Sequence, residues 1–453
     1  MLLGMSKSLL VTADWILPIS SPPLRNGAVE IRDGRIHAIG ARDELLSQSE
    51  AERRLDLGAA ALLPGLVNTH AHLELTALRG FLEEPDFFSW IRRLTETKYD
   101  VLDEADLLCS ARLGVAEATL AGVTTIGEIA DVGVSLQALS EGGLRAVLYQ
   151  EVFGPDPAQA EESLAGLLDK LHSHRAASVD RVTIGISPHA PYTVSRRLFK
   201  LVAELAQAEG YPVSVHAAES AAEGELVRDG RGPFAEYLRG RDIPVEPLGI
   251  STVSYFDELG LLEAHPLLAH CIDCSADDLR KIVDSGSSIA HCPKSNAKLA
   301  HGVAPLGAMR AAGARVGLGS DGVVCNNTCD LLEEARFAAL VQRAGGEAPS
   351  GEAGDYLRLM TLGGAEALGL ADSIGSLEAG KLADLCAVDL SAPHFQPVFD
   401  VEAAVLYSAS ARDIVLTVVE GEILYDGRRP GRLNPQGLYE SLEMIREKLS
   451  AAR

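Results

Sequence analysis

The sequence Leu63-Pro64-Gly65-Leu66-Val67-Asn68-Thr69-His70-Ala71-His72-Leu73-Glu74 begins as an apolar run, breaks at Pro-Gly and ends in His-Ala-His. In a β-strand, side chains two residues apart lie on the same face. His70 and His72 are therefore predicted to point the same way at the end of a buried strand. Two imidazoles placed like this form half of a site for a first-row transition metal. An isolated pair also fits two hydrogen-bonded histidines at a strand end, so the assignment depends on the rest of the chain.

Beyond this stretch, short apolar runs alternate with segments of helical periodicity. Strands are expected at 123–126, 144–152, 182–186, 213–216, 266–270, 288–291 and 316–318. Helices are expected at 104–121, 158–174, 196–209, 276–285 and 305–312. Alternating strand and helix units of this number predict an α/β fold, specifically a (β/α)₈ TIM barrel.

The two ends of the chain have a different texture, with short strands and hairpin turns at Asp33-Gly34 and Asp426-Gly427. The strand-like runs of both ends resemble each other, so we expect them to pair. The predicted domains are a small β-sandwich from residues 1–62 plus 380–432, a metal-dependent barrel from residues 63–379 and a C-terminal helix at 433–453.

The composition restricts the partners of the protein. It has 40 basic and 64 acidic residues, and the formal net charge of −24 disfavours nucleic acid and anionic membranes. The seven cysteines, an odd number, indicate reduced thiols in a cytoplasmic protein without a secretory signal. The most apolar run, residues 57–67, is too short to span a bilayer. A small-molecule substrate is therefore expected, and self-association into a homo-oligomer stays open.

Polar residues follow several of the predicted strands, at the end of a barrel where active sites lie. These endings are His189 with its neighbours, His216-Ala217-Ala218-Glu219, His270-Cys271, His291-Cys292-Pro293 and Ser320-Asp321-Gly322. One divalent ion would need neutral imidazoles, a carboxylate and an open position for water. The residues that fit as ligands are His70, His72, His216 and Asp321. Glu219 would lie in the loop over the ion and move protons, and His270 would orient the water or polarise the substrate.

These motifs together resemble the deaminase and chlorohydrolase group of the amidohydrolase superfamily. The matching segments are residues 64–72, Gly122-Val123-Thr124-Thr125, Pro188-His189-Ala190-Pro191-Tyr192, His216-Ala217-Ala218-Glu219, His270-Cys271, His291-Cys292-Pro293-Lys294-Ser295-Asn296, Ser320-Asp321-Gly322 and residues 375–385. The similarity extends from about residue 9 to residue 427. A non-catalytic scaffold of the superfamily would be expected to lack metal ligands, and no ligand is missing here.

The resemblance implies one zinc, or in some members iron, on the four ligands named above. It also implies that Glu219 and Asp321 handle protons and that His270 stabilises the tetrahedral centre. The strand at 182–186 lacks the lysine of binuclear relatives, which favours a single metal and disfavours a ring-opening amide hydrolase. The implied reaction is hydrolytic deamination at the C–N bond of a cyclic amidine, with release of ammonia.

The loops suggest the substrate. Residues 73–76, 88–92 and 149–153 resemble aminodeoxyfutalosine deaminases of the alternative menaquinone route, which is our main prediction. The alternative is a deaminase of S-adenosylhomocysteine or methylthioadenosine, although Ser89 and Glu151 depart from that pattern. A guanine, oxo-purine or triazine hydrolase also stays open. Predicted substrate contacts are His189, Trp90, Arg79 and Glu151, with Arg79 as a carboxylate ligand. Surface or structural positions are expected for His37, His172, His174, His265, His301 and His394.

Overall fold

Eight parallel strands form the centre of the protein in a computed structural model that describes residues 8–84, 86–177, 179–345, 351–427 and 431–452. They are β6 (Leu66–Ala71), β7 (Val123–Ala130), β8 (Arg145–Val152), β9 (Val182–Pro188), β10 (Ser214–Ala217), β11 (Leu267–His270), β12 (Ser288–His291) and β13 (Arg315–Leu318). The hydrogen-bonded order is β6-β7-β8-β9 in one half and β10-β11-β12-β13 in the other. The predicted (β/α)₈ barrel is confirmed.

The two halves meet along two seams. Between β9 and β10, Ile186 forms a parallel bridge with Val213. Between β13 and β6, the backbone N–H of Asp321 donates to the carbonyl of His70 over 2.8 Å. This second seam joins Asp321, three residues after the end of β13, directly to His70 of β6.

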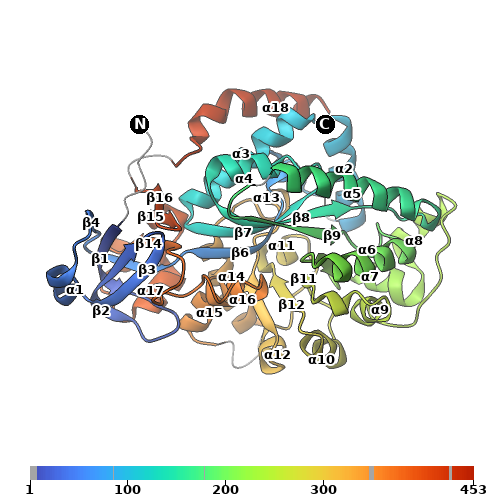
Figure 1. The fold of residues 1–453 in the computed structure, drawn as a ribbon. Coiled ribbons are helices and arrows are strands. Elements are labelled where there is room, and N and C mark those ends of the chain that lie inside the picture. The colour runs from blue at the N-terminus through green and yellow to red at the C-terminus, as the bar shows by residue number, and fades with distance from the viewer. Residues whose placement is uncertain (1–7, 85, 178, 346–350, 428–430, 453) are drawn as a thin grey trace.

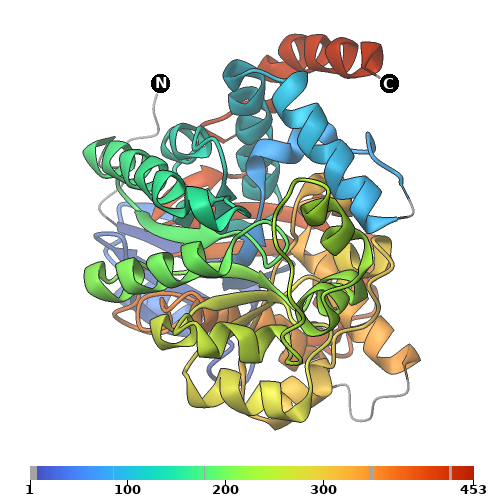
Figure 2. The same cartoon turned by 90° about the vertical axis from the view of Figure 1, so that its right-hand side faces the viewer.

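Helices pack around the barrel and over its carboxyl end, as can be followed in Figures 1 and 2. They are α2 (Phe87–Asp100), α3 (Glu104–Leu120), α4 (Ser135–Gly142), α5 (Ala160–Ala177), α6 (Arg196–Glu209), α7 (Ala221–Gly224), α8 (Gly232–Arg239), α9 (Thr252–Glu258), α10 (Ala276–Asp284), α11 (Pro293–Lys298), α12 (Leu306–Ala311), α13 (Val323–Asn326), α14 (Leu331–Ala344), α15 (Ala353–Leu359) and α16 (Leu362–Ala367). The helix predicted at 104–121 corresponds to α3, and Gly122 follows it with a φ of 82°, the left-handed conformation that ends many helices. None of the helices in the described ranges is both long and apolar enough to cross a membrane.

Strands from both ends of the chain build a second sheet beside the barrel, at the left of Figure 1. They are β1 (Ser8–Ile16), β2 (Leu24–Arg32), β3 (Arg35–Ala41), β4 (Arg53–Asp56), β5 (Ala60–Pro64), β14 (Leu385–Asp389), β15 (Ile414–Val419) and β16 (Glu422–Tyr425), with α1 (Arg42–Gln48) and α17 (Val401–Ser408) alongside. β14 pairs antiparallel with β5, so the predicted pairing of the two ends is confirmed. The eight strands share one hydrogen-bonded sheet, because β1 pairs with β2 on one edge and with β4 and β5 on the other.

The exact division into residues 1–62 plus 380–432, 63–379 and 433–453 remains our proposal, and residues 1–7, 428–430 and 453 of it lie outside the described part. The C-terminal helix is α18 (Tyr439–Ala451), which packs on α3. Its Lys448 Nζ lies 2.6 Å from Asp106 Oδ2, and its Ile445 and Leu449 side chains are buried.

Gly65 explains the Pro-Gly break in the sequence. It lies between β5 of the second sheet and β6 of the barrel. A Cβ atom at this position would lie 2.2 Å from the side chain of Thr124 on β7. Only glycine lets the chain pass this close as it moves from one sheet into the other. This crossing between the two sheets places β6, and with it His70, in the barrel.

Candidate metal centre and active site

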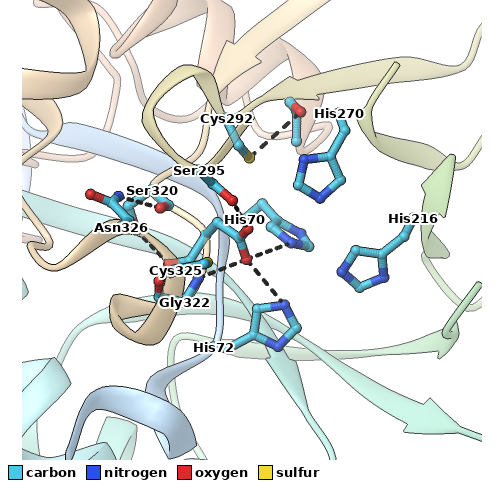
Figure 3. A network of polar contacts seen from close by, with 12 residues as sticks. His70, His72, His216, His270, Cys292, Ser295, Ser320, Gly322, Cys325 and Asn326 are labelled. Carbon is cyan, nitrogen blue, oxygen red and sulfur yellow. Dashed lines mark hydrogen bonds and ion pairs between the residues drawn. The ribbon is translucent and has the colours of Figure 1, made fainter. Parts of the chain in front are cut away.

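Four side chains from three strand ends converge at the carboxyl end of the barrel: His70 and His72 at the end of β6, His216 on β10 and Asp321 after β13. The ring of His70 lies 5.0 Å from the rings of both His72 and His216, centroid to centroid. Asp321 Oδ1 lies 3.6 Å from His70 Nε2 and 3.5 Å from His72 Nε2. Figure 3 shows the three rings and that of His270 facing one shared space. The strand-end residues of β6, β10 and β13 are thus brought together as the barrel geometry predicts.

The carboxylate of Asp321 is held from two sides. The Ser295 hydroxyl donates to Oδ2 over 2.5 Å, and the backbone N–H of Gly322 donates to Oδ1 over 2.7 Å. Asp321 itself has a φ of 59°, a conformation that turns the chain sharply after β13. Burial opposes ionisation of Asp321, but the contact with His70 outweighs it and lowers the pKa of this carboxyl well below its usual range. Asp321 is therefore a fixed negative charge.

The three histidines are neutral and have free lone pairs. Burial lowers the pKa of His70 and lowers that of His72 and His216 well below the usual value. The Nδ1 atom of His216 lies 2.9 Å from the carbonyl oxygen of His189, so Nδ1 carries the hydrogen and Nε2 is left for a ligand. Neither ring nitrogen of His70 makes a hydrogen bond to any described residue.

The donor set formed by these residues fits a metal ion. Three neutral imidazoles and a carboxylate are the ligands that zinc-like divalent ions prefer. The candidate ligand atoms of His70, His72 and Asp321 lie within 4.8 Å of one another, as do those of His70, His216 and His270. The hydrogen bond from His216 to the His189 carbonyl fixes one ligand ring, a common arrangement around protein metals. These residues could therefore hold one divalent ion.

Glu219 lies in the loop after β10, where its carboxyl group faces the same space. The backbone N–H groups of Ala218 and Glu219 donate to the carboxylate of Glu223 over 2.8 and 3.0 Å, which fixes the loop. The Tyr192 hydroxyl donates to Glu219 Oε2 over 3.2 Å. Burial first, and then the charge of Asp321, raises the pKa of Glu219 to about 8. Glu219 can therefore carry a proton at neutral pH and release it during a reaction.

His270 ends β11 and faces Glu219. Its Nε2 atom lies 3.6 Å from Glu219 Oε1. The side-chain oxygen of Asn296 lies 2.9 Å from His270 Nδ1, so Nδ1 is the protonated nitrogen and Nε2 points into the site as an acceptor. Asn296 was part of a matched motif, but the sequence did not reveal that it orients His270.

A cavity of about 350 Å³ leads away from these groups. His72, His216, Glu219 and Asp321 line its inner end. Aromatic rings line much of the remaining wall, namely Phe87, Phe88, Trp90, Tyr99, Phe153, Tyr192, Phe234 and Tyr237. The space suits a flat heteroaromatic ring with a substituent that extends toward the opening.

Three of the four predicted substrate contacts line this cavity, and one does not. His189, Glu151 and Trp90 line it, and Trp90 is buried. Arg79 is absent from the lining, because its guanidinium bonds the carboxylate of Glu117 on α3 and the carbonyl of Asn327. The structure therefore places Arg79, which was expected to bind a carboxylate of the substrate, outside the cavity.

His301 differs from the expectation of a surface or structural residue. Its side chain is 4% exposed, and its Nε2 atom lies 3.7 Å from Glu219 Oε1. His301 follows α11, where its backbone N–H donates to the carbonyl of Asn296 over 2.8 Å. The only sequence signal was its position shortly after the motif that contains Asn296.

Three further charged residues shape the cavity wall, and the sequence did not reveal the role of any of them there. The Glu74 carboxylate accepts the backbone N–H groups of Asp131, Val132 and Gly133 over 3.2, 3.0 and 2.7 Å. These bonds fix the loop after β7. In that loop, Asp131 Oδ2 lies 2.7 Å from the Nζ of Lys98 on α2, and both side chains line the cavity. Glu74 lies two residues after the His-Ala-His segment, but nothing in the sequence pointed to Lys98.

Comparison with known proteins places this site in a family. Residues 61–424 match the model of the amidohydrolase family. The chain belongs to the amidohydrolase family. As a member it is a hydrolase that acts on a carbon–nitrogen bond, as the sequence predicted.

The relatives and solved structures that match this amidohydrolase extend over nearly the whole chain. It is 34% identical to a 5-methylthioadenosine/S-adenosylhomocysteine deaminase of Moorella thermoacetica, covering 95% of this chain and 97% of the relative. An adenosine deaminase of Xanthomonas campestris with bound zinc superposes with a TM-score of 0.87 at 27% identity, covering 98% of each chain. An aminofutalosine deaminase of Helicobacter pylori has a TM-score of 0.79 at 23% identity, covering 91% of this chain and 99% of the other.

Proposed function

We propose that this amidohydrolase hydrolytically deaminates adenosine nucleosides that carry a thioether at the 5′ position, such as 5′-methylthioadenosine and S-adenosylhomocysteine. The observation that carries the proposal is the complete site of His70, His72, His216, Asp321 and Glu219 at the inner end of an aromatic cavity. The relative named for these substrates matches 95% of the chain at 34% identity and supports the same assignment.

The curated relatives favour this substrate class over our main prediction, aminodeoxyfutalosine. The Helicobacter aminofutalosine deaminase supports a shared fold at 23% identity and no closer relation. Residues 88–92 and 149–153, on which the aminodeoxyfutalosine prediction depended, include Trp90 and Glu151 in the cavity wall. Aminodeoxyfutalosine therefore remains the second candidate substrate.

His70, His72, His216 and Asp321 would hold the divalent ion, zinc first and iron second. When bound, such an ion makes a water molecule nucleophilic at neutral pH. Asp321 is ionised by its contact with His70, so it can accept a proton from that water at Oδ1. His72, His216 and Asp321 also line the cavity, so the substrate ring could approach the ion from that side.

Glu219 and His270 would carry the proton transfers. Glu219 holds a proton at neutral pH because of its burial, and it would donate this proton to the ring nitrogen beside the amine-bearing carbon. The water oxygen bonds to that carbon, and the carbon–amine bond breaks. The amine keeps its own two hydrogens and leaves as ammonia after it takes up the proton that Asp321 received from water, while the proton of the new hydroxyl group returns to Glu219. His270 Nε2 faces Glu219 Oε1 and would position the added oxygen during this exchange. The tyrosine hydroxyl of Tyr192 holds Glu219 in place.

An ammonia-release screen with zinc-loaded and iron-loaded protein tests the proposal. Its substrates are 5′-methylthioadenosine, S-adenosylhomocysteine, adenosine, aminodeoxyfutalosine, guanine and a chlorotriazine. We expect the highest kcat/KM with the two thioether nucleosides. A higher kcat/KM with aminodeoxyfutalosine would select the second candidate, and turnover of only guanine or the triazine would refute the nucleoside proposal. Asp321→Ala serves as the inactive control.

A further inference from the structure

Glu151 is a buried glutamate with one side-chain oxygen that makes no hydrogen bond to any residue the structure describes. It lies near the end of β8, lines the cavity and is 6% exposed. Within the described ranges, its Oε1 atom is buried and has no hydrogen-bond partner. A buried acceptor left unpaired destabilises a protein, and native structures retain few of them unless a ligand or water uses them. The free oxygen of Glu151 therefore indicates a ligand group in the cavity.

His189 supplies a second polar atom beside this oxygen. Its Nε2 atom lies 3.8 Å from Glu151 Oε1. The Thr193 hydroxyl donates to the carbonyl of Ala190 over 3.2 Å, so its oxygen accepts the hydrogen of His189 Nδ1 over 2.7 Å. This bond leaves His189 Nε2 free toward the cavity. Glu151 and His189 thus present two adjacent polar atoms in a wall that is otherwise rich in aromatic rings.

Lys98 and Asp131, two other charged residues on this wall, are already paired. Lys98 Nζ lies 2.7 Å from Asp131 Oδ2, and the Tyr99 hydroxyl donates to the same carboxylate. Lys98 is also 3.9 Å from Glu74 Oε2. Lys98 and Asp131 are therefore paired with each other. Oε1 of Glu151, in contrast, has no hydrogen-bond partner within the described residues and can accept a hydrogen bond from a ligand.

The order of the strands shows which part of a nucleoside meets Glu151. Glu219 follows β10, His189 follows β9 and Glu151 belongs to β8, and these are neighbouring barrel strands. Adjacent strands are about 4.8 Å apart, so Glu151 is displaced by about two strand spacings from Glu219 along the rim. In adenosine the sugar is attached at the end of the purine opposite the amine. If the amine end meets Glu219, the purine extends past His189 and the sugar reaches Glu151.

We propose that Glu151 is the sugar-binding residue of this enzyme and that its Oε1 accepts a hydrogen bond from a ribose ring hydroxyl while His189 contacts the purine. The inference rests on the proposed nucleoside deaminase function and adds to it a requirement for the ribose. Free bases lack both the 2′- and the 3′-hydroxyl group of the ribose, and deoxynucleosides lack one of them. The enzyme therefore discriminates against both kinds of compound at Glu151.

The test pairs changes in the sugar with changes in the protein. The best substrate from the nucleoside screen is compared with its 2′-deoxy and 3′-deoxy analogues, using wild type, Glu151→Ala and Glu151→Gln. The loss of one hydrogen bond to a buried polar group predicts that wild type prefers the ribonucleoside over one deoxy analogue by about tenfold to hundredfold in kcat/KM. Glu151→Ala is expected to reduce this preference to within about threefold. Glu96→Gln removes a carboxylate on the same cavity that pairs with Arg92, and it is expected to keep the wild-type preference.

A binding measurement separates recognition from turnover. Calorimetry with inosine and 2′- and 3′-deoxyinosine should show the same loss of preference in Glu151→Ala. Should that variant fail to fold, Glu151→Gln keeps the shape of the side chain and is expected to weaken the preference. Two results would overturn the role of Glu151 but leave the proposed function intact. One is an equal kcat/KM of wild type for the ribonucleoside and both deoxy analogues, and the other is an undiminished preference for the ribonucleoside in the folded variants. Absence of turnover with every adenosine nucleoside would overturn the proposed function, and the inference with it.

Discussion

Glu219→Gln should make the metal-free protein more stable while it removes activity. In the folded protein, burial raises the pKa of Glu219 from an ordinary value of 4.5 to about 8. The folded state therefore binds the proton more tightly than the unfolded state does. Stability that depends on this proton is complete below pH 4.5 and is lost as the pH rises to about 8. Glutamine has no proton to lose, so the variant escapes this loss.

The size of the effect follows from the same two values. Each pH unit between 4.5 and 8 corresponds to about 1.4 kcal/mol, so the full difference is about 5 kcal/mol, of which about 3 kcal/mol is reached at pH 7. Urea unfolding followed by circular dichroism, with chelator-treated wild type and variant at pH 4.5, 7 and 8.5, measures it. We expect a small difference at pH 4.5 and a difference that grows in favour of the variant with pH.

Activity provides the second half of this prediction. Loss of a positioned acid–base group lowers kcat by about 10²–10⁴-fold, and the metal content measured by mass spectrometry should remain at the wild-type level because Glu219 is not among the proposed ligands. A near-normal kcat would remove Glu219 from the mechanism. A stability difference that stays constant from pH 4.5 to 8.5 would refute the buried, protonated carboxyl.

Other substitutions separate the roles of neighbouring groups. Asp321→Ala should bind less than one tenth of the wild-type metal and fail to deaminate, and full activity would show that the fourth ligand is misassigned. His301→Asn removes the imidazole beside Glu219 Oε1 and should lower kcat about tenfold with little change in KM, whereas an effect on KM alone would make His301 a substrate contact. Arg79→Ala should leave kcat/KM for carboxylate-bearing substrates within about twofold of wild type, since its guanidinium is bound to Glu117. A selective loss with those substrates would return Arg79 to the binding site.

The strand ends were predictable because two local rules combine. Alternation in a strand placed His70 and His72 on one face, and the common direction of barrel strands brought them to His216 and Asp321. Both rules can be applied without knowledge of which residues are neighbours in the folded protein. The pairing of the β-strands from the two chain ends was also predictable, because these segments resemble each other in the sequence.

Residues whose role depends on a distant partner were not predictable in this way. Arg79 has the chemistry of a carboxylate ligand, but Glu117 on α3 already occupies its guanidinium. His301 gains its role from the loop that follows α11, and Lys98 from the position of Asp131 across the cavity. Such contacts are set by tertiary packing, which no periodicity in a single segment encodes.

The pairing of β14 with β5 has a consequence for the order in which the protein can mature on the ribosome. Cys386 lies opposite Leu63, and Leu63 stands just before the glycine that leads into β6 and His70. The barrel sequence is translated before β14 emerges, so until then β5 has an open edge next to the metal-site strand. Nascent chains arrested before residue 385 should therefore bind less divalent metal than the full chain, which would make metal loading a late step in the synthesis of the protein.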